Sequence, residues 1–160
     1  MKNVNVMWVG LFTKMSSGAK VCAPLHISTN TGKMVAEIEA QCLGVSFYKT
    51  NLVKFAPLDS MKVLRYPTYE ECILCYPELQ TEIQRVSPRV VLLLGIRTAT
   101  FILRQLGLQI PKLSYEYIAF DNKGVIYVPI HHPSYILVYK RKEKGLYIQA
   151  VKDVIERFIE

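Results

Sequence analysis

The stretch Pro88–Gly95, with the sequence PRVVLLLG, decides the fold class of this chain. Its apolar run shows no alternation with polar residues, which is typical of a parallel strand covered by helices on both faces. Strand-like runs and amphipathic helical segments alternate on either side of it, as expected for βαβ units with right-handed crossovers. We therefore expect an α/β fold with a mostly parallel sheet.

The neighbouring segments extend this pattern in both directions along the chain. Further strands are expected at Asn3 to Leu11, at Val45 to Val53 and in the run Gly124 to Val128. Helices are expected at Lys33 to Leu43, from a cap at Thr68 to about Val86, at Ile96 to Leu106 and at Glu143 to Glu160. In the second of these helices the expected core positions are Ile73, Leu79 and Ile83.

The composition indicates one globular domain over residues 1–160. The chain has 160 residues, 51% of them hydrophobic, and no apolar run as long as a membrane span, so we expect a cytoplasmic, monomeric protein without a membrane partner. Its four cysteines are expected to be reduced thiols. A net charge of +7 favours a polyanionic partner, although a basic surface without such a partner is also common.

Candidate site residues lie at the ends of three of the expected strands, and at two of these ends they are polar. They are Asn51 with Lys54, and the pair His131 and His132, while Gly10 closes the first strand. Because ligands bind outside the carboxyl ends of parallel strands, we expect these residues to share one crevice. Thr31 precedes a helix and could mark a phosphate site or a simple N-cap.

Several motifs resemble those of the uracil-DNA glycosylase superfamily, most closely the branch that includes the iron–sulphur enzymes. The matching stretches are Thr50–Lys54 (TNLVK), Cys75–Ile83 (CYPELQTEI), Pro88–Gly95, His132–Leu137 (HPSYIL) and Thr31–Met34 (TGKM). Their order and spacing match the family from about Val6 to the end of the chain. The resemblance implies a three-layer αβα sandwich with a short, mostly parallel four-stranded sheet.

The resemblance also implies base flipping and hydrolysis of an N-glycosidic bond in DNA, duplex or single-stranded. His132 would stabilise negative charge on the leaving base, and Asn51 would read the pyrimidine edge. The implied base pocket comprises Gly10, Leu11, Phe12, His26 and Ile27. The implied DNA contacts comprise Thr31, Lys54, Ser134, a wedge formed by Tyr135, Ile136 and Leu137, and the cations Lys140, Arg141 and Lys142.

The chain departs from the family pattern at three places. Leu11 stands where the family usually has a polar residue, and Ile27 stands near the position of the aromatic residue that stacks on uracil, with His26 or Phe12 as substitutes. Phe55 replaces one cluster cysteine, and Cys72 with Cys75 supplies only two thiolates where a cluster needs four. We therefore expect no metal and no cofactor, with a vestigial metal site at the cysteine pair left open.

The expected function is excision of a uracil-like or modified pyrimidine from DNA, leaving an abasic site. Two alternatives remain at this point. One is a glycosylase specific for a hypermodified base, such as a substituted cytosine, in phage DNA and acting in defence. The other is a catalytically inactive DNA-binding module on the same fold. The sequence assigns no residue to activate water.

Overall fold

The computed structural model describes residues 4–16 and 20–159 of the chain. Its strands are β1 (Val6–Phe12), β2 (Met15–Ser16), β3 (Lys20–Val21), β4 (Phe47–Val53), β5 (Val90–Leu94), β6 (Phe120–Asn122) and β7 (Val125–Ile130). Its helices are α1 (Asn30–Ala40), α2 (Tyr69–Val86), α3 (Ile96–Gln105), α4 (Pro133–Tyr139), the short 3-10 helix η1 (Arg141–Glu143) and α5 (Lys144–Phe158). The predicted ends at Asn3 and Glu160 lie outside the described residues.

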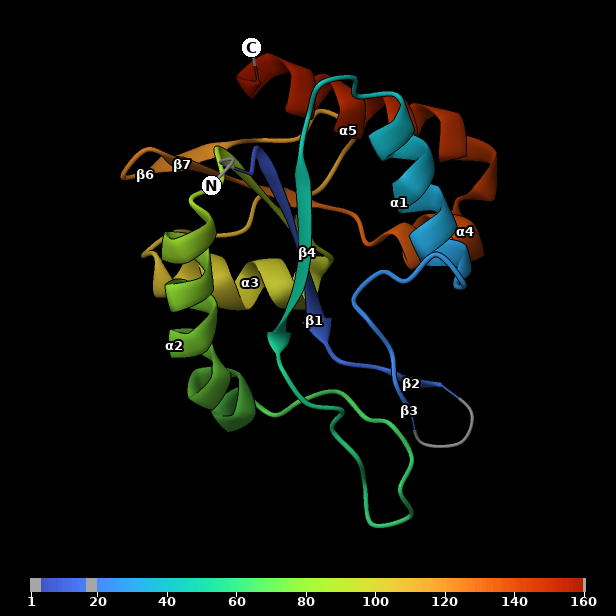
Figure 1. The fold of residues 1–160 in the computed structure, drawn as a ribbon, viewed down its shortest axis with the longest axis vertical. Helices are drawn as coiled ribbons and strands as arrows, with labels where there is room; N and C mark the ends of the chain where they lie inside the picture. Colours follow the sequence, from blue (N-terminus) through green and yellow to red (C-terminus); the bar gives the residue numbers. More distant parts are fainter. Residues whose placement is uncertain (1–3, 17–19, 160) are drawn as a thin grey trace.

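A single larger sheet runs through the molecule in the strand order β4-β1-β5-β7-β6 (Figure 1). The strands β4, β1, β5 and β7 are parallel, and β5 lies at the centre with all five residues buried. This confirms the mostly parallel sheet and the role of Pro88–Gly95. The sheet has five strands rather than four, because the chain turns at Gly124 and adds β6 antiparallel to β7.

Helices cover both faces of the sheet and form the expected three layers (Figure 1). One apolar cluster fills the space under α1, α4 and α5, and it includes Trp8, Leu92 and Tyr147. The other lies under α2 and α3 and includes Val9 and Leu93. Adjacent residues of β1 and β5 therefore face different clusters, which is how an unbroken apolar run stays buried.

The helix starts follow capping chemistry that is visible in the sequence. Thr29 caps α1 by accepting a hydrogen bond from the Gly32 amide at 2.9 Å, so this helix begins earlier than the predicted Lys33. Thr68 caps α2 in a capping box with Glu71, as predicted for this position. No described helix has the length and apolar character needed to cross a bilayer.

The predicted core of α2 is correct at two positions and wrong at one. Leu79 and Ile83 are buried, whereas Ile73 is 41% exposed. The helix instead buries Cys72 and Cys75, which lie seven and four residues before Leu79. Ile73 lies six residues before Leu79, a spacing that places it away from the buried face of a 3.6-residue helix.

Candidate active site

One half of the site lies where β1 and β4 end side by side. Gly10 of β1 pairs with Asn51 of β4 in the parallel register. A Cβ atom added to Gly10 would lie 2.6 Å from the Asn51 Oδ1 atom, so the amide leans over this glycine. Asn51 is 9% exposed, and none of the hydrogen bonds found among the described residues engages its side-chain amide. The amide is therefore available to a ligand.

A charged network holds the end of β4 on the face of the sheet covered by α2, opposite to the face toward which the Asn51 side chain points. The Lys54 ammonium lies 2.5 Å from the Asn51 carbonyl oxygen and 2.6 Å from a Glu82 carboxylate oxygen of α2. Glu82 also accepts hydrogen bonds from the hydroxyls of Tyr48 and Thr50. Burial raises the pKa of Glu82, but these donors outweigh burial and lower it overall, so the carboxylate stays charged.

This network bears on the predicted DNA contact of Lys54. Its ammonium is committed to acceptors within the protein, and its side chain is only 24% exposed. The geometry therefore favours a structural role for Lys54, which positions Asn51, over contact with DNA.

The other half of the site lies where β5 and β7 end. Gly95 follows β5 with φ of 88°, and a Cβ atom added there would lie 3.3 Å from the His132 Cβ atom. His132 follows β7 and caps α4. A side chain at Gly95 would therefore press on the histidine and would also strain the backbone. Sequence reasoning used Gly95 only as part of a strand motif and missed this role.

Ser134 fixes the tautomer of His132. The His132 Nδ1 atom accepts the backbone N–H of Ser134 at 3.1 Å and also lies 2.7 Å from the Ser134 Oγ atom. Because a backbone N–H can only donate, Nδ1 is unprotonated and the neutral ring carries its proton on Nε2. Burial, and then the nearby charge of Lys14, lowers the pKa of His132 to about 4. At neutral pH the ring is an uncharged Nε2–H donor.

The two halves mirror each other across the middle of the sheet. The inner strands β1 and β5 end in Gly10 and Gly95, and the flanking strands β4 and β7 lead to Asn51 and His132. Each polar side chain leans over the glycine of the adjacent inner strand. Gly10 and Gly95, which we call the glycine floor, therefore lie between the Asn51 amide and the His132 imidazole.

The other predicted base-pocket residues are not gathered at this floor. Leu11 and Phe12 pack against the apolar cluster under α2 and α3, where Phe12 meets the edge of Tyr66. His26 and Ile27 lie exposed in the loop before α1, with the His26 Nδ1 atom 2.8 Å from the Ser28 Oγ atom. Their roles in base binding remain predictions.

The predicted wedge after His132 lies in the short helix α4. Ile136 is fully buried in the core between α4 and the sheet, so its assignment to DNA contact is wrong for this conformation. Leu137 is half-buried against the same core. Tyr135 is 41% exposed, and Ser134 serves the His132 ring. The exposed side chains of α4 are Tyr135, Val138 and Tyr139.

The predicted cations and Thr31 lie at the surface or close to it. Lys140, Arg141 and Lys142 are exposed at the end of α4 and in η1, and Arg141 donates to the Leu137 carbonyl oxygen at 3.2 Å. Thr31 is half-buried in the first turn of α1, where Thr29 rather than Thr31 is the cap. Their contacts with DNA remain predictions.

The cysteines do not fit an iron–sulphur cluster. Cys42 packs in the cluster under α1 and α5, whereas Cys72 and Cys75 pack under α2, on the other face of the sheet. Four thiolates cannot meet across the sheet. Burial is the main cause that raises the pKa of Cys42 and of Cys72, which favours protonated thiols. Within residues 4–16 and 20–159, no group of three or more potential ligands is placed to hold a metal ion.

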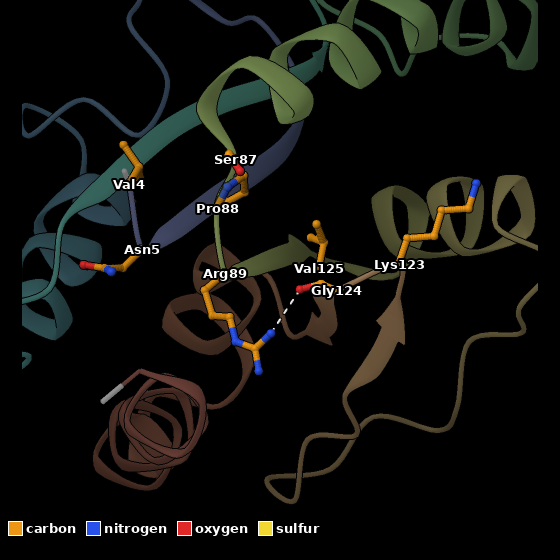
Figure 2. Close-up of a pocket in the computed structure, with 8 residues that line it drawn as sticks. All are labelled: Val4, Asn5, Ser87, Pro88, Arg89, Lys123, Gly124 and Val125. Atoms are coloured by element: carbon orange, nitrogen blue, oxygen red, sulfur yellow. Dashed lines mark hydrogen bonds between the residues drawn. The ribbon is translucent and has the colours of Figure 1, made fainter. Parts of the chain in front are cut away.

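A hollow of about 390 Å³ lies at the opposite end of the sheet. It is lined by Asn5, Arg89 and Lys123 among others, and Figure 2 shows Arg89 turned toward the Gly124 carbonyl oxygen while Lys123 points away. This end carries the amino ends of β1, β5 and β7, where open α/β sheets rarely bind ligands. We therefore place the site at the carboxyl ends.

The family model described as the Uracil DNA glycosylase superfamily matches residues 11–155. A type-4 uracil-DNA glycosylase of Saccharolobus solfataricus is 25% identical over 133 residues, which cover 78% of this chain and 56% of that protein. A type-4 uracil-DNA glycosylase of Sulfurisphaera tokodaii is 25% identical over 112 residues, which cover 64% and 49%. The chain thus spans about half the length of these relatives.

A solved structure supports the fold independently. The crystal structure of wild-type Pedobacter heparinus SMUG2 matches with a TM-score of 0.59 at 12% identity, covering 97% of this chain and 76% of that chain. The matched span of the family model includes Asn51, Gly95 and His132. The chain belongs to the uracil DNA glycosylase superfamily.

Proposed function

We propose that this protein is a DNA glycosylase that takes a uracil-like or modified pyrimidine out of the strand, hydrolyses its N-glycosidic bond and leaves an abasic site. The observation that carries the proposal is the pairing of a free Asn51 amide with a neutral, Nε2-protonated His132 over two glycines. Family membership and the type-4 uracil-DNA glycosylase relatives support the same reaction class.

The spacing of the two halves suits one flat ring. Strands in a sheet lie about 4.8 Å apart, so β4 and β7 are separated by about 14 Å across β1 and β5. Asn51 and His132 lean inward from these strands over Gly10 and Gly95, so the gap between the two side chains is narrower than the separation of the strands. Flipping the nucleotide into this gap costs a few kcal/mol of lost stacking and pairing, which the pocket contacts offset.

Asn51 supplies the recognition in this scheme. A side-chain amide carries both a donor and an acceptor, which matches the adjacent N–H and C=O groups on the edge of a uracil-like ring. The contact is specific because the amide is 9% exposed and a mismatched edge would leave buried polar groups unpaired. Gly10 is part of this recognition because it leaves space for the amide oxygen.

His132 supplies the electrostatic catalysis. When the bond between C1′ and the ring nitrogen breaks, both electrons go to the base, and the Nε2–H group donates to the carbonyl oxygen where negative charge develops. Water then adds its oxygen to C1′ and the released proton neutralises the base.

No side chain is assigned to activate the water. Leu11 stands at the position where relatives of this family usually carry a polar residue, and it packs against the apolar cluster under α2 and α3. The scheme therefore rests on stabilisation of the leaving base, with water attacking a sugar cation that has already formed most of its charge.

The test is base excision from oligonucleotides that carry uracil or other modified pyrimidines, read as strand cleavage at abasic sites after alkali. His132→Ala should lower the single-turnover rate by about 100- to 1,000-fold. Asn51→Ala should lower it by about 10- to 100-fold. The matched control is Asn122→Ala, since Asn122 lies in β6 at the far edge of the sheet and should leave the rate unchanged.

A glycosylase specific for a hypermodified base in phage DNA is the second candidate. It is favoured by Ile27, which is 57% exposed and gives no aromatic platform where uracil would stack. Excision from modified phage DNA but not from uracil DNA would favour this candidate and a role in defence. Retained, salt-sensitive DNA binding without excision from any substrate would contradict both enzymes and leave an inactive DNA-binding module.

A further inference from the structure

The rings of His131, Tyr135 and Tyr139 contact one another in turn beside the site, and we call this row the aromatic ladder. The His131 and Tyr135 rings stack at 5.7 Å between centroids with an interplanar angle of 10°, and Tyr135 meets Tyr139 at 5.4 Å and 43°. The two tyrosines are four residues apart on α4, so they share one helix face. The ladder starts at His131, the residue before His132.

The inner end of this ladder is held firmly. The His131 Nδ1 atom lies 2.6 Å from the hydroxyl of the buried Tyr117, and the Tyr147 hydroxyl donates to the His131 carbonyl oxygen at 2.8 Å. Burial is the main cause that lowers the pKa of His131, so the ring is neutral at pH 7. A fixed, uncharged ring gives the ladder a defined orientation.

The outer end of the ladder is open to solvent. Exposure rises from 41% at Tyr135 to 72% at Tyr139. The outermost ring is thus largely uncovered, and core packing does not account for it. An exposed aromatic surface of this kind on a basic protein suits a ligand that is both flat and anionic.

A hollow of about 300 Å³ adjoins the same rings. Its lining includes Tyr115, His131, Tyr135, Lys140 and Glu143, and the Tyr115 hydroxyl donates to Glu143 at 3.1 Å. The hollow thus combines flat apolar walls with one cation and one carboxylate. Within the described residues, no ion pair engages Lys140. Its charge is available to a phosphate, and Glu143 can accept from a base amino group.

We infer that Tyr135, Tyr139 and the adjoining hollow stack the unpaired bases that flank the target nucleotide, with Lys140 on the backbone, so that the protein engages a single strand. The inference rests on the proposed function for its choice of DNA. Base faces are free for stacking only where a strand is unpaired, whereas a duplex presents its phosphates and groove edges. The ladder begins one residue from His132, within reach of the neighbouring nucleotide.

The test measures binding and stacking without requiring excision. Single-stranded oligonucleotides with 2-aminopurine beside the target position are titrated with protein, and anisotropy and 2-aminopurine fluorescence are read together. Tyr139→Ala should weaken single-strand binding by about 5- to 150-fold and restore the fluorescence that stacking quenches. Tyr139→Phe, which keeps the ring, should behave as wild type. Lys140→Gln should reduce the slope of log affinity against log salt by about 0.7.

The control is Tyr69→Ala, because Tyr69 is a 61% exposed tyrosine on α2, on the other face of the sheet. Unchanged binding and quenching in Tyr139→Ala would overturn the inference, as would tighter binding of duplex than of single strand. If the wild-type protein excises a base but Tyr139→Ala changes neither binding nor quenching, the inference is overturned and the proposed function stands. Quenching that depends on Tyr139 without any excision would support the stacking surface and contradict the glycosylase.

Discussion

The Asn51 half and the His132 half of the site share a geometry but are held in different ways. In both, a polar side chain leans over a glycine at the end of the neighbouring strand. Asn51 is positioned by the charged Lys54–Glu82 network on the other face of the sheet. His132 is positioned by the neutral Ser134, two residues away.

Although the two groups are held in different ways, both are uncharged at neutral pH. Neighbouring residues of a strand point to opposite faces, so Thr50 joins the ionic network while Asn51 faces the glycine floor. His132 has no carboxylate partner in the described structure, and burial keeps its ring neutral. The result is two uncharged hydrogen-bonding groups, which suit a neutral base that becomes negative only as it leaves.

Among changes that keep both polar groups, the largest loss of excision is expected from filling the space at Gly10 or Gly95. In Gly10→Ala the new methyl group would lie 2.6 Å from the Asn51 Oδ1 atom and displace the amide, so excision should fall by about 100-fold. Gly95→Ala would press on His132 and would also place alanine at φ 88° and ψ 162°, a region that is nearly restricted to glycine, adding about 1–3 kcal/mol of strain.

The matched control for both changes is Gly145→Ala, because a Cβ atom there meets no atom within 4 Å and the residue lies in α5. Excision should be unchanged and stability should rise by up to about 1 kcal/mol. Wild-type excision by Gly10→Ala, measured in single turnover on protein with an unchanged melting temperature, would contradict the glycine floor.

The next largest effect concerns the charged network under Asn51. Lys54→Met leaves Glu82 half-buried without its ion-pair partner and should lower the free energy of unfolding by about 3 kcal/mol. Adding Glu82→Leu should recover much of that loss. Urea denaturation of the two single variants and the double variant gives the coupling. Additive losses would show that the pair does not act as a unit.

Acid should affect the His132 half through protonation of the ring. The pKa of His132 in the folded protein is about 4, below the usual 6.5, so the unfolded state binds more protons between these values. The free energy of unfolding should therefore fall as pH drops from 6.5 to about 4, by at most about 3 kcal/mol, and stay level above 6.5.

The measurement is stability against pH for wild type and His132→Gln. Part of the slope between pH 6.5 and 4 should disappear in the variant. Excision should stay constant from pH 8 to about 5 and fall as the ring is protonated near pH 4. A fall in activity centred near pH 6.5 would mean that the ring is not held neutral.

The smallest effect is expected for Ser134→Ala. The Oγ contact at 2.7 Å is lost, but the backbone N–H still bonds to Nδ1 and keeps the tautomer. Excision should fall by about 5- to 10-fold, the value of one hydrogen bond. A loss as large as that of His132→Ala would show that the Ser134 hydroxyl, rather than its backbone N–H, fixes the tautomer of the His132 ring.

The central strand and the position of the site were predictable because both follow from local pattern. The run Pro88–Gly95 has no polar interruption, and it forms the central strand β5. Asn51 and His132 follow strand-like runs, and the carboxyl ends of parallel strands share one edge. The sequence alone therefore predicted both polar groups at one edge of the sheet, where strands β4 and β7 end.

Features that depend on long-range contacts were not predictable. Lys54 and Glu82 are 28 residues apart and meet only in the folded protein, so Lys54 looked like a free cation. The helix α4 begins with His132 as its cap, a residue that rarely signals a helix start, so Ile136 was assigned to the DNA wedge. Pro133 at the first position was the available signal for this helix.

The most direct measurement is mass spectrometry of the base released from oligonucleotides that carry uracil or modified pyrimidines. We expect wild type to release one free pyrimidine and leave an abasic strand, and His132→Ala and Asn51→Ala to release it at least about 10-fold more slowly. Release of no base from any substrate would contradict the account of a neutral amide–imidazole pocket. Release at the wild-type rate by the variant that combines His132→Ala and Asn51→Ala would contradict it as well.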